Sequence, residues 1–265
     1  MVRPDYPGAA AGKDWVCRLT PMIVAIHQPN YVPWLGYFDR MIRSDLFVLL
    51  DHVQFERRNY QNRCLIRCED QEKWLTVPVV QVSQKERIID KKIDNPEDLS
   101  GTRWWGPNHF NTLRYAYRKA PHFDLYAPRL REILEARWDK LLDLNIAMLD
   151  FARDALEIAT PMVRSSELAV DGQKSALLLA ICRKVGAAAF FGGMGGSREY
   201  LDKEAFAAAN MGTVWQQFTH PVYPQQGTAP FMKGLTVLDL LFNCGPRAAE
   251  VARQTQAVEH ELLAA

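Results

Sequence analysis

The strongest constraint on the fold of this chain is a short apolar run that stops abruptly in polar residues, within residues 23–38. The apolar part, residues 23–26, is rich in β-branched side chains, which is typical of a buried strand. Pro29 and Pro33 stiffen the loop that follows, and Gly36 lets two backbones approach closely. Open α/β sheets place their ligands where a strand ends in such a loop and a helix follows. The run therefore indicates a binding site at the first strand end, with the candidate residues His27, Gln28, Asn30 and Tyr31.

A second buried strand is expected at residues 45–51, and it ends in the carboxylate of Asp51. A strand, a helix at about 35–43 and a second strand predict a parallel pair joined by a right-handed crossover. The carboxyl ends of both strands then lie at the same edge of the sheet. A carboxylate near His27, Asp51 or Asp45, could orient it as a general base in the manner of a catalytic triad, and of the two we expect Asp51. The alternative is that His27 only fixes the geometry of its loop.

The remaining hydrophobic pattern predicts a three-layer α/β fold with a mostly parallel, Rossmann-like sheet. Residues 52–160 interrupt this pattern, and we interpret them as an insertion with a β-hairpin and a helical subregion. Its expected elements are hairpin strands at 62–67 and 73–79, a short strand at 88–90, and helices at 104–119, 125–134 and 138–156. After the insertion we expect strands at 159–163, 187–191 and 213–218, and helices at 175–184, 200–210 and 235–241, the last capped by Asn243 and Gly245. Residues 22–265 are interpreted as one domain.

A glycine-rich turn stands between an expected strand and an expected helix, and it contains Gly192, Gly193, Gly195 and Gly196. Glycines in this position expose backbone N–H groups that can hold a phosphate or a carboxylate. The spacing matches neither the Walker A loop nor the dinucleotide-binding fingerprint. A tight structural turn is therefore the alternative to an anion site.

A second loop resembles the first in composition, because Phe218 is followed by histidine, tyrosine and glutamine held between prolines. Its candidate residues are His220 for catalysis, and Tyr223 and Gln225 for substrate binding. Two such loops at strand ends of one sheet would face each other across one cleft. The alternative is again a histidine that only fixes its loop.

Arginines and aromatic residues alternate after Asp51, in a segment that contains Arg57, Arg58, Tyr60 and Arg63. An arginine fork binds carboxylate or phosphate groups through paired hydrogen bonds, and aromatic faces can stack on a sugar or a base. We expect Arg63, together with the glycine-rich turn, to hold an anionic donor. The alternative is a basic loop exposed to solvent.

Composition narrows the classes of function. The formal net charge of +1 gives no reason to expect an extensive nucleic-acid-binding surface, and no segment reaches the ~20 apolar residues that span a bilayer. The five cysteines form neither a zinc-binding pattern nor a paired framework, so we expect reduced thiols, no metal site and a cytoplasmic location. We expect a small-molecule donor and a small-molecule acceptor as partners. The sequence names no cofactor and no oligomeric state.

Residues 1–21 are expected to be a disordered extension, because they are rich in glycine, alanine and proline and lack a hydrophobic period that would dock them. Met22 directly precedes the first expected strand. A chain that starts at Met22 should therefore fold with an unchanged melting temperature, measured by thermal denaturation beside the full chain. A decrease of several degrees would show that the extension packs on the core.

Linked motifs along the chain resemble the WbqC-like protein family. They include His-Gln-Pro-Asn-Tyr at 27–31, Asp-Leu-Phe-Val-Leu-Leu-Asp at 45–51, His-Pro-x-Tyr-x-Gln at 220–225 and Leu-Thr-Val-Leu-Asp-Leu-Leu-Phe-Asn at 235–243. The resemblance implies that the substrate-binding site also includes Gln54, Asn62, Ser197 and Tyr200. It further implies a place in gene clusters for O-antigen and other surface polysaccharides, or for natural products, beside enzymes that make amino sugars.

Three classes of function are consistent with these features. The leading one is an enzyme that modifies an amino sugar or small amine by acyl or aminoacyl transfer, with His27 or His220 taking the amine proton. The second is a nucleotide-dependent adenylyl or nucleotidylyl transferase, a group with a His-x-Gly-His motif after the first strand. Residues 34–37, Trp-Leu-Gly-Tyr, stand in that place without either histidine. The third is a non-catalytic protein that binds a ligand or assists assembly.

Overall fold

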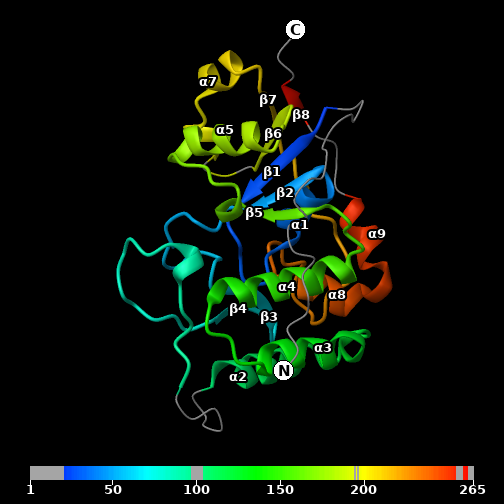
Figure 1. Ribbon diagram of the computed structural model, residues 1–265. Coiled ribbons are helices and arrows are strands. Elements are labelled where there is room, and N and C mark those ends of the chain that lie inside the picture. The colour runs from blue at the N-terminus through cyan, green and yellow to red at the C-terminus, as the bar shows by residue number, and fades with distance from the viewer. Residues whose placement is uncertain (1–20, 97–103, 194, 196, 255–258, 262–265) are drawn as a thin grey trace.

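Residues 21–96, 104–193, 195, 197–254 and 259–261 are described by a computed structural model of the protein (Figure 1). The main sheet has six strands in the order β5-β2-β1-β6-β7-β8. β8 runs antiparallel to β7, and the other neighbouring pairs are parallel. The strands are β1 (Ile23–His27), β2 (Leu46–Leu49), β5 (Met162–Arg164), β6 (Ala189–Gly192), β7 (Gly212–Trp215) and β8 (Glu259–Glu261). The predicted mostly parallel sheet is confirmed.

The strand order shows that the sheet is doubly wound. From the central β1 the chain moves outward to β2 and then β5, and it later returns to the other side of β1 to form β6 and β7. In open α/β sheets, ligands bind outside the carboxyl ends of the strands at the point where the order reverses. Here that switch point lies between the ends of β1 and β6.

Helices cover both faces of the sheet and complete three layers (Figure 1). They are α1 (Leu35–Ile42), α5 (Lys174–Lys184), α7 (Lys203–Ala208), α8 (Val237–Cys244) and α9 (Ala248–Arg253). On one face Val24 and Phe190 pack with α5 and α7. On the other, Ala25 and Phe191 belong to a larger apolar cluster with α1, α8 and α9. Alternate strand residues enter alternate clusters, which explains why the strands read as continuous apolar runs.

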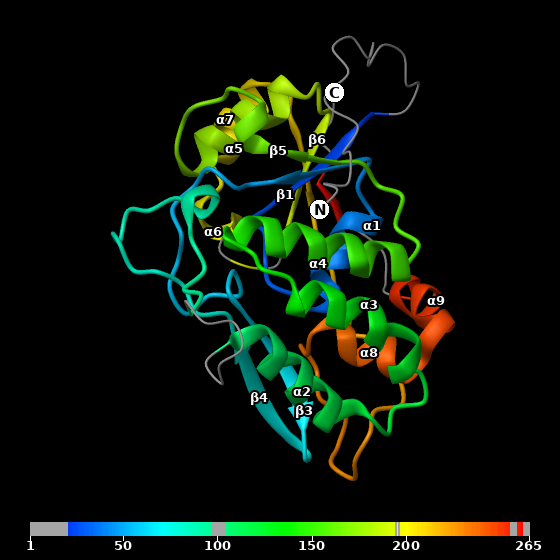
Figure 2. The ribbon, with the colours of Figure 1, turned by 60° about the horizontal axis from the view of Figure 1, so that its bottom comes forward.

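Residues 52–160 add the predicted hairpin and helices. Their elements are β3 (Arg63–Cys68), β4 (Gln71–Thr76), α2 (Trp105–Tyr117), α3 (Phe123–Glu135) and α4 (Leu141–Ala155). β3 and β4 pair antiparallel around Glu69 and Asp70, both of which have positive φ values. α3 and α4 contact each other and α8 (Figure 2). Their apolar side chains belong to the same cluster as the α1 face of the sheet, so the insertion and the sheet share one core.

Two predicted elements have a different form in the structure. The strand predicted at 88–90 is the 3₁₀ helix η1 (Ile88–Asp90), whose first two backbone N–H groups donate to the carbonyls of Val53 and Asp51. The helix predicted at 200–210 is divided into α6 (Ser197–Tyr200) and α7. Asp202 begins α7 because its side chain accepts a hydrogen bond from the Ala205 N–H.

Other predictions were wrong at their boundaries. The strand predicted at 213–218 ends at Trp215, and the side chain of Gln216 then donates to the Gly36 carbonyl. Asn243, predicted as a cap, lies inside α8, which ends at Gly245 with a φ of +55°. α9 and β8 were not predicted, because both are short and lack a periodic pattern.

The structure also bears on the expectations about membrane spans, metal sites and cysteines. Within the described ranges, no helix is both long and apolar enough to cross a membrane. In the same part of the chain, no group of three or more His, Cys, Asp or Glu side chains is arranged to hold a metal ion. Cys64 and Cys182 are buried free thiols, and burial raises the pKa of each. Cys17 and nearly all of the extension predicted at 1–21 lie outside the described residues.

Candidate functional site

The candidate site lies at the switch point, where β1 and β6 end. The two strands pair in parallel, with Ala25 opposite Phe191. The same register, continued to the ends of both strands, aligns His27 with Gly193, the first residue after β6. The loop after the first strand and the glycine-rich turn therefore meet at the same edge of the sheet.

His27 is held in one tautomer by its own loop. Its Nδ1 lies 2.9 Å from the Gln28 carbonyl oxygen. A carbonyl oxygen can only accept a hydrogen bond, so Nδ1 carries a proton, and in the neutral ring Nε2 is the nitrogen with the lone pair. The ring is half-buried against Tyr37, with 4.6 Å between the ring centroids. This arrangement suits a neutral general base.

A row of aromatic rings leads from His27 to the hairpin, and we call it the aromatic row. The Trp34 ring lies 6.2 Å from His27 and 5.1 Å from Tyr60, and Tyr60 lies 5.5 Å from Trp74. The guanidinium of Arg63 covers the Trp74 ring at 4.2 Å. Trp74 is 39% exposed. A chain of ring contacts thus connects Arg63, a predicted site residue, to His27 through Trp34, Tyr60 and Trp74. Trp34 and Trp74 were not predicted as site residues.

Hydrogen bonds tie the loops after β1 and β2 together. Gln28 Oε1 accepts from Gln61 Nε2 at 2.9 Å, and Gln61 Oε1 accepts from the Glu56 N–H at 3.0 Å. The pKa of Tyr200 is raised by burial and then by the charge of Glu56, while Arg40 acts in the opposite direction. Tyr200 of α6 therefore stands within electrostatic range of both residues. We call the residues gathered around this edge of the sheet, His27, Gln28, Arg40, Gly193 and Tyr200, the switch-point group.

Arg40 of α1 was not predicted as a site residue. It is only 5% exposed, and its Nη1 lies 2.9 Å from the point that a Cβ on Gly193 would occupy. The available signal was its spacing, because Arg40 follows Tyr37 by three residues and so shares the buried face of the helix. A cation on the buried face of a helix was as good a candidate for a site residue as the arginines of the loop.

Asp51 is buried and faces the end of β5. Its carboxylate accepts hydrogen bonds from Arg164 Nε at 2.8 Å, Ser165 Oγ at 3.0 Å, and the Ser166 N–H at 2.9 Å. Burial alone raises the pKa of Asp51, but the hydrogen bonds from Arg164 and Ser166 outweigh it and the net shift is downward. Among the described residues no contact joins this carboxylate to His27. The orientation of His27 comes from the Gln28 carbonyl instead.

His220 follows β7 at the same edge of the sheet. Its Nδ1 lies 3.0 Å from the Pro221 carbonyl, so its tautomer matches that of His27. Its ring packs between Phe218 and Phe231, and burial lowers its pKa. The Phe218 ring also lies beside Trp34 around Gly36. His220 thus reaches the aromatic row only through Phe218, and it shares no ring contact with His27 in the described structure.

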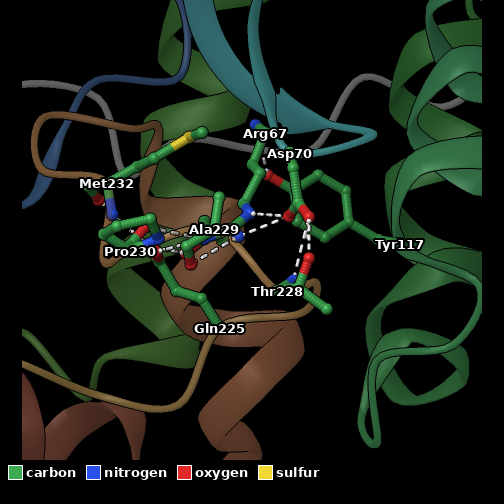
Figure 3. Close-up of polar contacts among 9 residues, drawn as sticks. Arg67, Asp70, Tyr117, Gln225, Thr228, Ala229, Pro230 and Met232 are labelled. Carbon is green, nitrogen blue, oxygen red and sulfur yellow. Dashed lines mark hydrogen bonds and ion pairs between the residues drawn. The ribbon is translucent and has the colours of Figure 1, made fainter.

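Tyr223 and Gln225 belong to a separate buried network, and Figure 3 shows the part of it around Gln225 and Arg67. Tyr223 Oη and Gln225 Nε2 both donate to Asp239 Oδ2 at 2.9 Å. Arg67 Nη1 donates to Gln225 Oε1 at 3.1 Å, and Arg67 also pairs with Asp70. Burial raises the pKa of Asp239. These contacts fasten α8 and the loop after β7 to β3, which is the pattern of a structural brace.

A cavity of about 310 Å³ lies beside this network, with Asp70, Tyr115 and Arg118 among its lining residues. It adjoins the turn of the hairpin, whereas Arg63 stands at the opposite end of β3. A strand of this length spans roughly 17–20 Å. The cavity is therefore distinct from the switch point.

Other predicted site residues support the loops. Asn30 is buried, and the hydroxyl of Tyr31 lies 3.0 Å from His109 Nδ1 in the core. Asn62 Nδ2 donates to the Val77 carbonyl, and Gln54 donates to the Gln84 carbonyl at the surface. A Cβ on Gly195 would meet nothing within 4 Å. Gly196 and the side chain of Ser197 lie outside what the structure describes.

A family profile described as the WbqC-like protein family matches residues 28–251, which is most of the chain. The chain belongs to the WbqC-like protein family. A protein of Mycobacterium tuberculosis, described as uncharacterized protein Rv1507c, is 30% identical over 232 residues, which cover 87% of this chain and 97% of that protein. No solved structure matches the chain. The resemblance noted in the sequence is confirmed.

The match places most of the switch-point group inside the family region. In this WbqC-like protein, residues 28–251 include Arg40, Gly193, Tyr200 and the tryptophans of the aromatic row. His27 directly precedes the matched range. The geometry of the site is therefore carried by the family region and by one histidine at its border.

Proposed function

We propose that this WbqC-like protein is a transferase that modifies an amino sugar or a comparable small amine by acyl or aminoacyl transfer. The setting we propose is the biosynthesis of a surface polysaccharide such as O-antigen, or of a natural product. The observation that carries the proposal is the position of His27, whose free Nε2 stands at the head of the aromatic row.

The aromatic row suits an acceptor with a ring. The apolar C–H face of a sugar packs well on an aromatic face, while its polar edge stays free for hydrogen bonds. Trp74 and Tyr60 supply such faces, and Arg63 beside Trp74 supplies donors for hydroxyl or carboxylate groups. A ring bound along this row directs one of its substituents towards His27.

The reaction requires one base and one activated donor. The amine nitrogen attacks the carbonyl carbon of the donor, and the proton that it loses moves to His27 Nε2. The bond between that carbon and the leaving group breaks, and its electron pair departs with the leaving group. The imidazolium then returns the proton to the leaving group, so the histidine is regenerated.

Binding of matched sugars tests the acceptor. We expect glucosamine to raise the melting temperature more than glucose, because the two differ only in the amine. Trp74→Ala should weaken glucosamine binding by about 3–10-fold through the loss of one stacking face. Leu125→Ala is the matched control, since Leu125 is also an exposed apolar side chain but lies on α3.

Turnover tests the reaction itself. Glucosamine incubated with a panel of acyl-coenzyme A thioesters and aminoacyl-tRNAs should gain the mass of one acyl or aminoacyl group. Equal binding of glucosamine and glucose, unaffected by Trp74→Ala, would contradict the acceptor. Stabilisation by ATP together with transfer of a nucleotidyl group would replace the proposal with the nucleotidylyl transferase alternative.

A further inference from the structure

Arg40 is a buried cation for which no hydrogen bond or ion pair is found within the described part of the chain. Burial lowers its pKa from 12.5 to about 10, and Tyr200 is the ionisable group that opposes this effect. Its neighbour Arg43, in contrast, pairs with Asp39 at 2.7 Å. Arginines are almost never fully buried unless they are paired, because an uncompensated buried charge is costly. The guanidinium of Arg40 therefore has donors available for a partner that is not part of the protein.

The guanidinium of Arg40 lies close to Gly193, the first residue after β6. Its Nη1, Cζ and Nε lie 2.9, 3.1 and 3.5 Å from the position of a Cβ on Gly193. A side chain at that position would force the guanidinium to shift, so the observed position of Arg40 depends on the glycine. The arginine and the glycine therefore fit each other, and together they form one surface at the switch point.

Other charges around this turn favour an anion. Asp39, the nearest carboxylate in sequence, is already used by Arg43 and by Gln216 of the β7 end. A second cation, Arg198 of α6, lies over the ring of Trp215 at 5.6 Å, and that ring fills the space above Gly192. The turn thus has an arginine on α1 and another on α6.

We infer that Arg40 and the backbone at Gly193 form a binding site for a phosphate group. This inference extends the proposed function, because the phosphate then belongs to the transfer donor or its leaving group. A phosphate offers more acceptor oxygens than a carboxylate, so it can take the arginine fork and backbone N–H groups at the same time. The switch point of a doubly wound sheet is also where such groups bind.

The test is calorimetric titration of the full chain with inorganic pyrophosphate, at constant ionic strength and against sodium acetate. Wild-type protein should bind pyrophosphate in preference to acetate. Arg40→Met should weaken the affinity for pyrophosphate by about 10–100-fold, the loss expected for hydrogen bonds to a charged group. Arg40→Lys should have an intermediate affinity for pyrophosphate, because lysine keeps the positive charge but lacks the paired N–H donors of the guanidinium.

Two more variants separate binding from structure. Gly193→Ala keeps the charge of Arg40 but moves it, so it should also weaken pyrophosphate binding. Arg129→Met removes the same charge from the exposed surface of α3 and should leave the affinity unchanged. The melting temperature of Arg40→Met should stay the same or rise, because no protein partner is lost. A structural arginine would instead lower it.

The outcomes distinguish this inference from the proposed function. Equal pyrophosphate affinity in wild-type protein and Arg40→Met would overturn it, as would a fall of several degrees in the melting temperature of that variant. Pyrophosphate binding that depends on Arg40 supports the phosphate site even when no amine is modified. Modification of an amine with pyrophosphate affinity unaffected by Arg40→Met supports the transferase and rejects the phosphate site.

Discussion

Replacing His27 by alanine is expected to lower the turnover of the amine by ~10²–10⁴-fold while the protein stays folded. The reason is that the Nε2 lone pair, left free by the hydrogen bond of Nδ1 to the Gln28 carbonyl, is the base in the proposed reaction. The ring is half-buried at the end of a strand, so its removal leaves the main core intact. Steady-state turnover and melting temperature, measured on the same preparation, check this expectation.

The same variant discriminates between two roles for this histidine, general base and loop brace. If His27 only braces its loop, stability should fall by about 1–3 kcal/mol and activity per folded molecule should be kept. His220→Ala is measured beside it as the variant of the alternative base, because His220 has the same bond from Nδ1 to a neighbouring carbonyl. Full activity in a stable His27→Ala protein would exclude both roles and direct attention to His220.

Asp51→Ala is expected to lower the free energy of unfolding by about 3–5 kcal/mol. Its carboxylate is fully buried and accepts hydrogen bonds from Arg164, Ser165 and Ser166, so the substitution leaves several donors unpaired. Urea denaturation at neutral pH measures the loss. Asp90→Ala is the control, because Asp90 forms a similar pair with Arg87 at 2.7 Å but on the surface, where about 0–1 kcal/mol is expected.

The pH dependence of stability gives a second measurement for the same carboxylate. Because hydrogen bonds from Arg164 and Ser166 hold the pKa of Asp51 below its usual value, the group contributes stability above the unfolded pKa of ~3.9. That contribution is lost as the pH falls through the lower folded value. The wild type should therefore lose part of its advantage over Asp51→Ala below about pH 4. A constant difference down to the lowest measurable pH would contradict this.

The local pattern of apolar residues was sufficient to predict the parallel sheet and the end of the first strand. Residues 23–26 and 46–49 are apolar on both faces, and only a strand covered by helices on both sides needs that pattern. The pairing of β6 with β1 could not be predicted in this way, because it depends on contacts between residues far apart in the chain. The roles of side chains that depend on such contacts were therefore harder to predict from the sequence.

The same contrast between local motifs and distant contacts applies to the candidate site. His27 and Gln28 were predicted because they belong to one local motif, whereas Trp74 joins them only through the pairing of β3 with β4. Asp51 was expected beside His27, but its partners come from the end of β5, which the chain reaches only after the whole insertion. Arg40 was missed because a cation in a helix is normally placed in solvent.

The core shared by the sheet and the insertion has a consequence for the order in which the chain can fold during synthesis. α8 fills part of that core and contacts α3 and α4, yet it begins at Val237, long after α4 ends at Ala155. Until α8 is synthesised, part of the apolar surface of α3 and α4 has nothing to pack against. We therefore expect the nascent chain to remain incompletely packed, and to depend on protection from aggregation, until α8 emerges.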